Sequence, residues 1–219
     1  ANALHDSHGL TLQAQKTKIY TSQEFIDQVL ETDEQKEIKS LVDGFDDIID
    51  GLGLQNPYDP IDYDDLSPET QAKINGLNLE NLLYEQLAKD EIDIPTTKFL
   101  INRLGRLKRT EPLDNILAAI DNLHPVLSEI VRYLSEIGEG LSQEKRQEIG
   151  ALILSKLQDS VVSNLEFNKM QIMSVFAGTN NWGNTERLAR YYNFESDAFF
   201  RRTVLLALGK SGQDFWLRT

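Results

Sequence analysis

The feature that most constrains the fold is a succession of segments whose apolar residues recur with helical spacing. In residues 124–137 they fall three and four positions apart and form one helix face: Leu127, Ile130, Val131, Leu134 and Ile137. Residues 34–50 and 142–157 show the same period, and no strand-like alternation follows Tyr20. Repeated amphipathic segments of this kind predict helices that pack on one another.

Turn and cap residues divide these segments. Gly51 and Gly53 should end the helix at residues 34–50, Ser67-Pro68 should begin another, and Gly76 should split that stretch in two. Later helices should begin at Thr96 or Thr97, at residues 110–112, at His124-Pro125, at Ser142 and at Ser196. Helices are also expected over residues 164–177, 184–193 and 197–208.

Two segments resemble each other, Leu100 to Leu107 and Leu205 to Gly212. Each reads as a helix that ends in Leu-Gly-basic, which predicts left-handed, helix-ending conformations at Gly105 and Gly209. Short turns between helices of this length suit stacked helical pairs. The expected fold class is therefore all-α, either a helical bundle or an irregular HEAT-like α-superhelix, with a small N-terminal β remnant.

The charge is unevenly distributed along the chain. Residues 24–93 contain 20 Asp and Glu against 4 Lys and Arg, whereas residues 94–219 contain 14 against 16. An acidic segment repels phosphate, so nucleic acid is not expected on residues 24–93. The basic residues of the second part form two groups, which supply the candidate nucleic-acid-binding residues: Arg103, Arg106, Lys108 and Arg109, and then Arg187, Arg190, Arg201 and Arg202.

Aromatic residues accompany the second basic group: Tyr191, Tyr192, Phe194, Phe199 and Phe200. Cations with stacking platforms suit single-stranded nucleic acid or a template–primer duplex. The alternative is a solvated helix face whose aromatic residues belong to the core. Trp182, in a polar turn, either anchors that turn in the core or is exposed for recognition.

Metal sites are not expected. The chain has no cysteine. The loop with Asp59, Asp62, Asp64 and Asp65 lacks the spacing of a calcium loop, and His5 and His8 have no evident third ligand. No apolar run is long enough to span a membrane, so a cytoplasmic protein without a membrane partner is expected.

Gly9 to Ile19 reads Gly-Leu-Thr-Leu-Gln-Ala-Gln-Lys-Thr-Lys-Ile and resembles the last palm motif of reverse transcriptases, roughly Gly-Leu-x-Leu-Asn-x-x-Lys-Thr-x-Ile. The match covers about a tenth of the chain, and Gln13-Ala14-Gln15 departs from the family pattern. The resemblance implies that Lys16 lies on the pyrophosphate side of the active site in the intact parent. It also implies Mg²⁺ for that parent and no cofactor in this piece.

The same resemblance implies a C-terminal fragment of an RNA-directed DNA polymerase. Tyr63-Asp64-Asp65 resembles the catalytic Tyr-x-Asp-Asp of that family, but it follows the lysine motif instead of preceding it. The catalytic aspartates are therefore missing, and the fragment should be inactive. Bacterial reverse-transcriptase-like proteins of phage-defence types carry comparable helical-repeat C-terminal regions.

The expected organisation is a palm remnant at residues 1–22, an acidic helical thumb-like region at 23–93 and a HEAT-like helical domain at 94–219. The expected function is non-catalytic: to guide template–primer nucleic acid through residues 94–219, or to mediate homo-oligomerisation or binding of a protein partner. The alternative is an acidic helical-repeat scaffold unrelated to polymerases.

Overall fold

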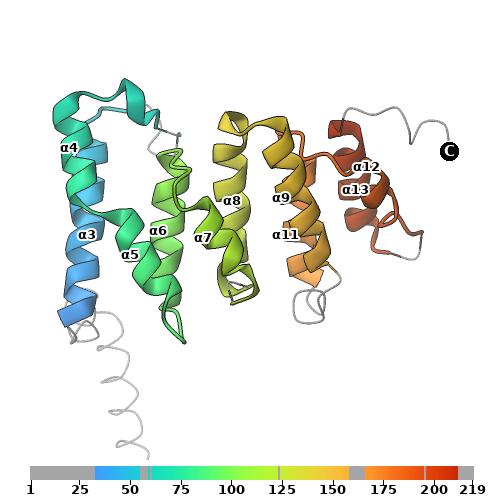
Figure 1. The fold of residues 1–219 in the computed structure, drawn as a ribbon, viewed down its shortest axis with the longest axis horizontal. Coiled ribbons are helices and arrows are strands. Elements are labelled where there is room, and N and C mark those ends of the chain that lie inside the picture. Colours follow the sequence, from blue (N-terminus) through green and yellow to red (C-terminus); the bar gives the residue numbers. More distant parts are fainter. Residues whose placement is uncertain are drawn as a thin grey trace, which may run out of the picture. The chain divides into compact units, whose positions relative to one another are not determined.

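The structure is a computed structural model that describes residues 33–54, 59, 61–122, 124–157, 166–194 and 196–211. These residues form α-helices and short 3-10 turns, and none of them belongs to a strand, which confirms the all-α fold class (Figure 1). The expected β remnant and Lys16 lie outside the described residues. The chain divides into two compact units, Ala1–Leu52 and Gly53–Thr219. The predicted boundaries after residues 22 and 93 stay predictions.

The described part of the first unit is helix α3, Asp33–Asp50. It confirms the helix expected over residues 34–50. Phe45 and Ile49 are buried, whereas Asp43, Asp46 and Asp47 are exposed. The amphipathic pattern of this segment therefore sorts its residues as the sequence predicts.

The second unit is built from short helices. In chain order they are α4 (Pro68–Gly76), α5 (Leu79–Leu87), α6 (Ile94–Arg106), α7 (Leu113–Ala118), α8 (Leu127–Ile137), α9 (Gln143–Lys156), α11 (Glu166–Ala177), α12 (Thr185–Ala189) and α13 (Ala198–Lys210). Four 3-10 turns accompany them: η1 (Tyr63–Asp65), η2 (Ile120–Asn122), η3 (His124–Val126) and η4 (Gly138–Gly140).

The longer helices of this unit contact one another in succession. α5 packs on α6, α6 on α8, α8 on α11, and α11 on α13, while α12 also packs on α13. Each contact buries aliphatic side chains, such as Leu100 and Leu104 on α6, Ile130 and Leu134 on α8, and Val204 on α13. The apolar core is therefore continuous from helix to helix.

Most predicted helix starts are confirmed. The Ser67 hydroxyl accepts a hydrogen bond from the amide of Thr70 at 3.2 Å, with Pro68 at the first helical position. The Ser142 hydroxyl accepts one from the amide of Lys145 at 3.1 Å. Both bonds satisfy amides that have no partner within the helix.

Two predicted caps are wrong. Helix α6 begins at Ile94 and is capped by Asp93, whose carboxylate accepts from the amide of Thr96 at 2.9 Å, so neither Thr96 nor Thr97 is the cap. Helix α13 is capped by Asp197 and not by Ser196. Asp93 lies three residues before Thr96, and Asp197 directly follows Ser196; in both cases the negative charge of the carboxylate is favoured at a helix N-terminus.

The predicted conformations of Gly105 and Gly209 are also wrong, because both glycines lie inside helices. The left-handed residue after α6 is Lys108, at φ +53°. Gly105 instead serves close helix packing. A Cβ there would lie 3.1 Å from Cα of Tyr133 on α8 and 2.7 Å from Oε2 of Glu136.

Candidate functional site

The first basic group contacts its own chain. Arg103 stacks its guanidinium over the ring of Phe99, 4.6 Å from the centroid, and donates to the Asn102 side chain at 2.8 Å. Arg106 donates from Nε to the carbonyl of Asp59 at 3.1 Å. Both side chains are half-buried. The guanidinium of Arg106 thereby joins α6 to the segment of Asp59, whereas these two contacts of Arg103 lie within α6.

Arg109 is the centre of a polar cluster. Its Nε lies 2.9 Å from Glu80 and 3.3 Å from Glu111, and its guanidinium stacks over Tyr63, 4.8 Å from the ring centroid. The carbonyl of Arg109 accepts a hydrogen bond from the hydroxyl of Tyr133 at 2.6 Å. Lys108 is the one exposed member of the predicted group Arg103, Arg106, Lys108 and Arg109.

Two phenols near Arg109, those of Tyr133 and Tyr84, have a pKa above the ordinary value. Burial, reinforced by the charge of Glu111, raises the pKa of Tyr133. Partial burial, followed by the nearby Glu80 and Glu111 carboxylates, raises the pKa of Tyr84 and outweighs the lowering effect of Arg109. Both phenols therefore keep their protons to a higher pH than an exposed tyrosine does.

The second basic group is divided. Arg187 on α12 is half-buried and donates to the carbonyl of Ala151 at 3.3 Å, and Arg201 donates to the carbonyl of Phe194. Arg190 and Arg202 are exposed. The structure therefore brings these four arginines to neighbouring helices but leaves only Arg190 and Arg202 fully presented to solvent.

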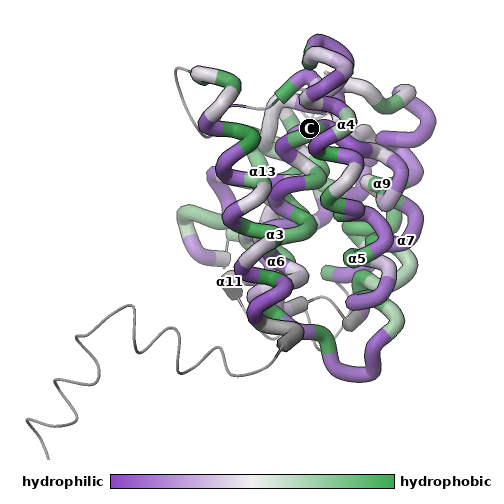
Figure 2. Tube along the Cα trace, turned by 90° about the vertical axis from the view of Figure 1, so that its left-hand side faces the viewer, coloured by the Kyte–Doolittle hydropathy of each residue, from purple (hydrophilic) through white to green (hydrophobic). Residues whose placement is uncertain are grey.

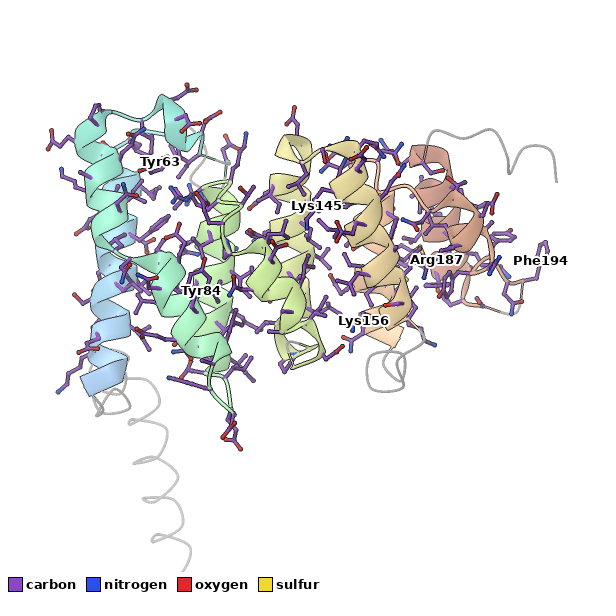
Figure 3. All side chains as sticks on the ribbon, in the orientation of Figure 1. Tyr63, Tyr84, Lys145, Lys156, Arg187 and Phe194 are labelled. Atoms are coloured by element: carbon purple, nitrogen blue, oxygen red, sulfur yellow. The ribbon has the colours of Figure 1, made fainter. Side chains whose placement is uncertain are left out.

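The aromatic residues near these arginines have two different environments. Phe194 and Phe199 are 79% and 65% exposed, whereas Phe200 is buried. Phe194 lies at the edge of this unit, on the segment between α12 and α13, with its ring edge-to-face on Tyr192 at 5.4 Å between centroids (Figure 3). Neither alternative from the sequence, stacking platforms or core residues, describes all five aromatic residues, because some are in the core and others face solvent.

Helix α13 is apolar on two faces. Its inner face carries the buried residues Phe200, Thr203, Val204, Ala207 and Leu208. Its outer face carries five exposed residues: Phe199, Arg202, Leu205, Leu206 and Gly209. Figure 2 shows hydrophobic and hydrophilic residues alternating along the helices of the chain. Leu205 is 42% exposed and Leu206 is 51% exposed.

We call the exposed residues Ala198, Phe199, Arg202, Leu205, Leu206, Gly209 and Lys210 the outer row of α13. A helix with large apolar residues on two faces normally has both faces covered. Sequence reasoning missed this row, although its signal is present in Ala-Phe-Phe-Arg-Arg-Thr-Val-Leu-Leu-Ala-Leu.

Trp182 is a core residue, which confirms the alternative that it anchors its turn in the core and excludes exposure for recognition. Its side chain is 2% exposed. A Cβ on Gly138 would lie 2.9 Å from the indole, and a Cβ on Gly150 would lie 2.4 Å from the Trp182 carbonyl. Both glycines are therefore needed for the close approach of the Trp182 segment to α9 and to the turn after α8.

Among the residues that the structure describes, the remaining candidates form no further site. The segment Tyr63–Asp65 is a 3-10 turn, and within the described ranges no three His, Cys, Asp or Glu side chains converge as a metal site. His5 and His8 lie outside those ranges. Of the helices that the structure describes, none is both long and apolar enough to cross a membrane.

Comparison with known proteins identifies no relative, so the function has to be argued from the geometry. No protein-family model matches the chain, and neither a curated protein nor a solved structure matches it significantly.

Proposed function

We propose that this chain is a non-catalytic assembly region, which joins its parent polypeptide to protein through the outer row of α13. One observation carries the proposal: Phe199, Leu205 and Leu206 expose apolar surface on a helix whose other face is already buried. Contiguous exposed apolar surface of this kind is typical of protein interfaces. The inward contacts of Arg103, Arg106 and Arg109 favour a structural role for the first basic group.

Carbene footprinting inside cells that express the chain tests this assembly role. Ile94 is a matched control, since it is 40% exposed and Leu205 is 42% exposed. We expect the outer row to be labelled much less than Ile94 in cells, and Leu206→Glu to restore labelling of Phe199 and Leu205. Equal labelling of Leu205 and Ile94 in cells would sink the proposal.

A second candidate function, guidance of template–primer nucleic acid, is favoured by a separate observation. Arg190 and Arg202 are exposed, and the nearby Phe194 ring offers a stacking face. Single-stranded nucleic acid needs both cations and aromatic planes. Titration with fluorescent single-stranded DNA and RNA over a salt series tests this. A salt-sensitive affinity that falls in Arg190→Glu/Arg202→Glu supports it, whereas no binding near about 50 mM salt excludes it.

For the parent we propose a bacterial, cytoplasmic reverse-transcriptase-like nucleotidyltransferase of the phage-defence type. The support is the resemblance of residues 9–19 to the last palm motif. In that parent Lys16 would act on the pyrophosphate side of a Mg²⁺-dependent reaction. The test is polymerisation by the intact parent. Loss of nucleotide incorporation in Lys16→Ala, with the fold retained, supports this placement, and full activity overturns it.

A further inference from the structure

We infer that the protein partner of α13 is a second copy of this chain, whose α13 packs antiparallel on the first about a twofold axis. This inference rests on the proposed assembly role and adds the identity of the partner and the register. It comes from how residues are ordered along the outer row.

The outer row has a large side chain, Phe199, near its start and no side chain, at Gly209, near its end. Phe199 lies near the start of α13 and is 65% exposed, while Gly209 lies near its end. No atom lies within 4 Å of where a Cβ of Gly209 would be. In an antiparallel pair centred near Val204, Phe199 of each copy lies opposite Gly209 of the other. The ring of Phe199 on each copy therefore packs against the open position at Gly209 on the other. This contact occurs twice, as a twofold interface requires.

The charges at the two ends of α13 are opposite. Asp197 stands at the N-terminus and Lys210 in the last turn, and both are exposed. Oδ1 of Asp197 accepts hydrogen bonds from the amides of Phe199 at 2.8 Å and Phe200 at 3.2 Å. Oδ2 takes no part in this cap. The antiparallel register places Asp197 of each copy beside Lys210 of the other, whereas a parallel pair would place like charges together.

The centre of the row fits the same register. Arg202 falls opposite Leu206 of the second copy, so the two Arg202 side chains are offset along the helices and can extend to solvent. Leu205 and Leu206 of both copies meet near the axis. Nucleic acid suits this part of the row poorly, because aliphatic side chains offer phosphate no charge and bases no aromatic plane.

Sedimentation of the purified chain over a concentration series is the first test. We expect a reversible dimer, and we expect Leu206→Glu to raise its dissociation constant by about tenfold or more, since a buried leucine would be replaced by a charge. Gly209→Ala separates assembly from folding. The added Cβ meets nothing within the chain, so thermal stability should hold or rise, while the dimer should weaken because the position facing Phe199 is filled.

Cross-linking tests the register. Because the chain has no native cysteine, only introduced cysteines can form disulfides. Chains with Phe199→Cys and chains with Gly209→Cys should form a disulfide when mixed and oxidised, and neither should dimerise covalently alone. Covalent dimers of Phe199→Cys with itself would overturn the antiparallel register and leave the assembly role standing. A purified chain that stays monomeric, with α13 protected only in cells, would overturn the second copy as partner. A purified monomer with α13 equally labelled in cells would overturn both proposals.

Discussion

At the scale of single residues, the hydroxyl of Tyr133 is a small group that links two helices. It is the donor in the 2.6 Å bond to the carbonyl of Arg109, and its side chain is fully buried. The carbonyl belongs to the turn between α6 and α7, so one phenol fixes the exit of α6 against α8. Since burial raises the pKa of this phenol, the donor is kept through neutral and mildly alkaline pH.

Tyr133→Phe should lower the free energy of unfolding by about 1–2 kcal/mol, because a part-buried carbonyl loses its hydrogen bond to the phenol. Urea denaturation measures this. Tyr191→Phe is the matched control: the hydroxyl of Tyr191 reaches the carbonyl of Leu154 at 3.4 Å, a distance at which little stabilisation is expected. Equal losses in the two variants would contradict this explanation.

Glu136 should make stability depend on pH. Burial raises its pKa despite the opposing charges of Arg132 and Arg106. The folded state therefore holds this proton at a pH where the unfolded state has released it, so the contribution of Glu136 falls as pH rises from the unfolded pKa through the folded one. Glu136→Gln should gain stability relative to the native chain at pH 7, with the difference vanishing near about pH 4. An unchanged difference between these pH values would contradict the assignment.

At the scale of elements, Arg146 holds the turn after α8 to the segment before α12. From α9 it donates to the carbonyls of Gly138 at 2.9 Å, Leu141 at 2.6 Å and Asn181 at 3.1 Å. Asn181 also donates to the carbonyl of Ser211 at 3.0 Å, at the end of α13. The elements from α8 to α13 thus share one polar junction, which the planar guanidinium can serve with several donors at once.

Arg146→Lys should destabilise the second unit by about 1–3 kcal/mol, because an ammonium keeps the charge but cannot reproduce the fork of donors. Chemical denaturation of the purified chain provides the number. Arg202→Lys, on an exposed arginine, is the comparison and should change stability by less than about 0.5 kcal/mol. A similar effect for both would show that the junction contributes little.

Periodicity and cap chemistry predicted most elements of this fold. Local sequence patterns were enough to predict the helix over residues 34–50 and the helix caps at Ser67 and Ser142. The two misplaced caps each lie at an aspartate, three or four residues before the predicted threonines in α6 and one residue after Ser196 in α13. The role of Gly105 could not be foreseen, since it depends on how closely α8 approaches, which is a tertiary property.

The candidate site was less predictable than the fold. The basic residues near α12 and α13 were found from their spacing, but sequence could not tell that Arg187 and Arg201 donate to carbonyls while Arg190 and Arg202 face solvent. The outer row of α13 escaped notice because a helix with two apolar faces has no clear periodicity. Only its packing on α11 and α12 shows which face remains uncovered.

At the scale of the whole molecule, the net charge of −13 separates the two candidate functions. Two copies of an acidic chain repel each other, and exposed ion pairs such as Asp197 with Lys210 contribute little to affinity, so added salt should strengthen dimerisation by screening the net repulsion. Binding to nucleic acid through Arg190 and Arg202 should weaken with salt, because counterions compete for the phosphates. Sedimentation and nucleic-acid titration from low to high salt should therefore give slopes of opposite sign. A dimer that weakens steeply with salt would contradict the apolar interface.

The burial of Trp182 makes the chain its own optical reporter. The sequence contains two tryptophans, at positions 182 and 216, so Trp216→Phe leaves a single indole, enclosed beside Gly138 and Gly150. Its emission maximum should lie at short wavelength while the turn after α8, α9 and the Trp182 segment stay packed, and should move to longer wavelength when water reaches the ring. A shift that precedes loss of helical circular dichroism would mark this junction as the first part of the chain to open.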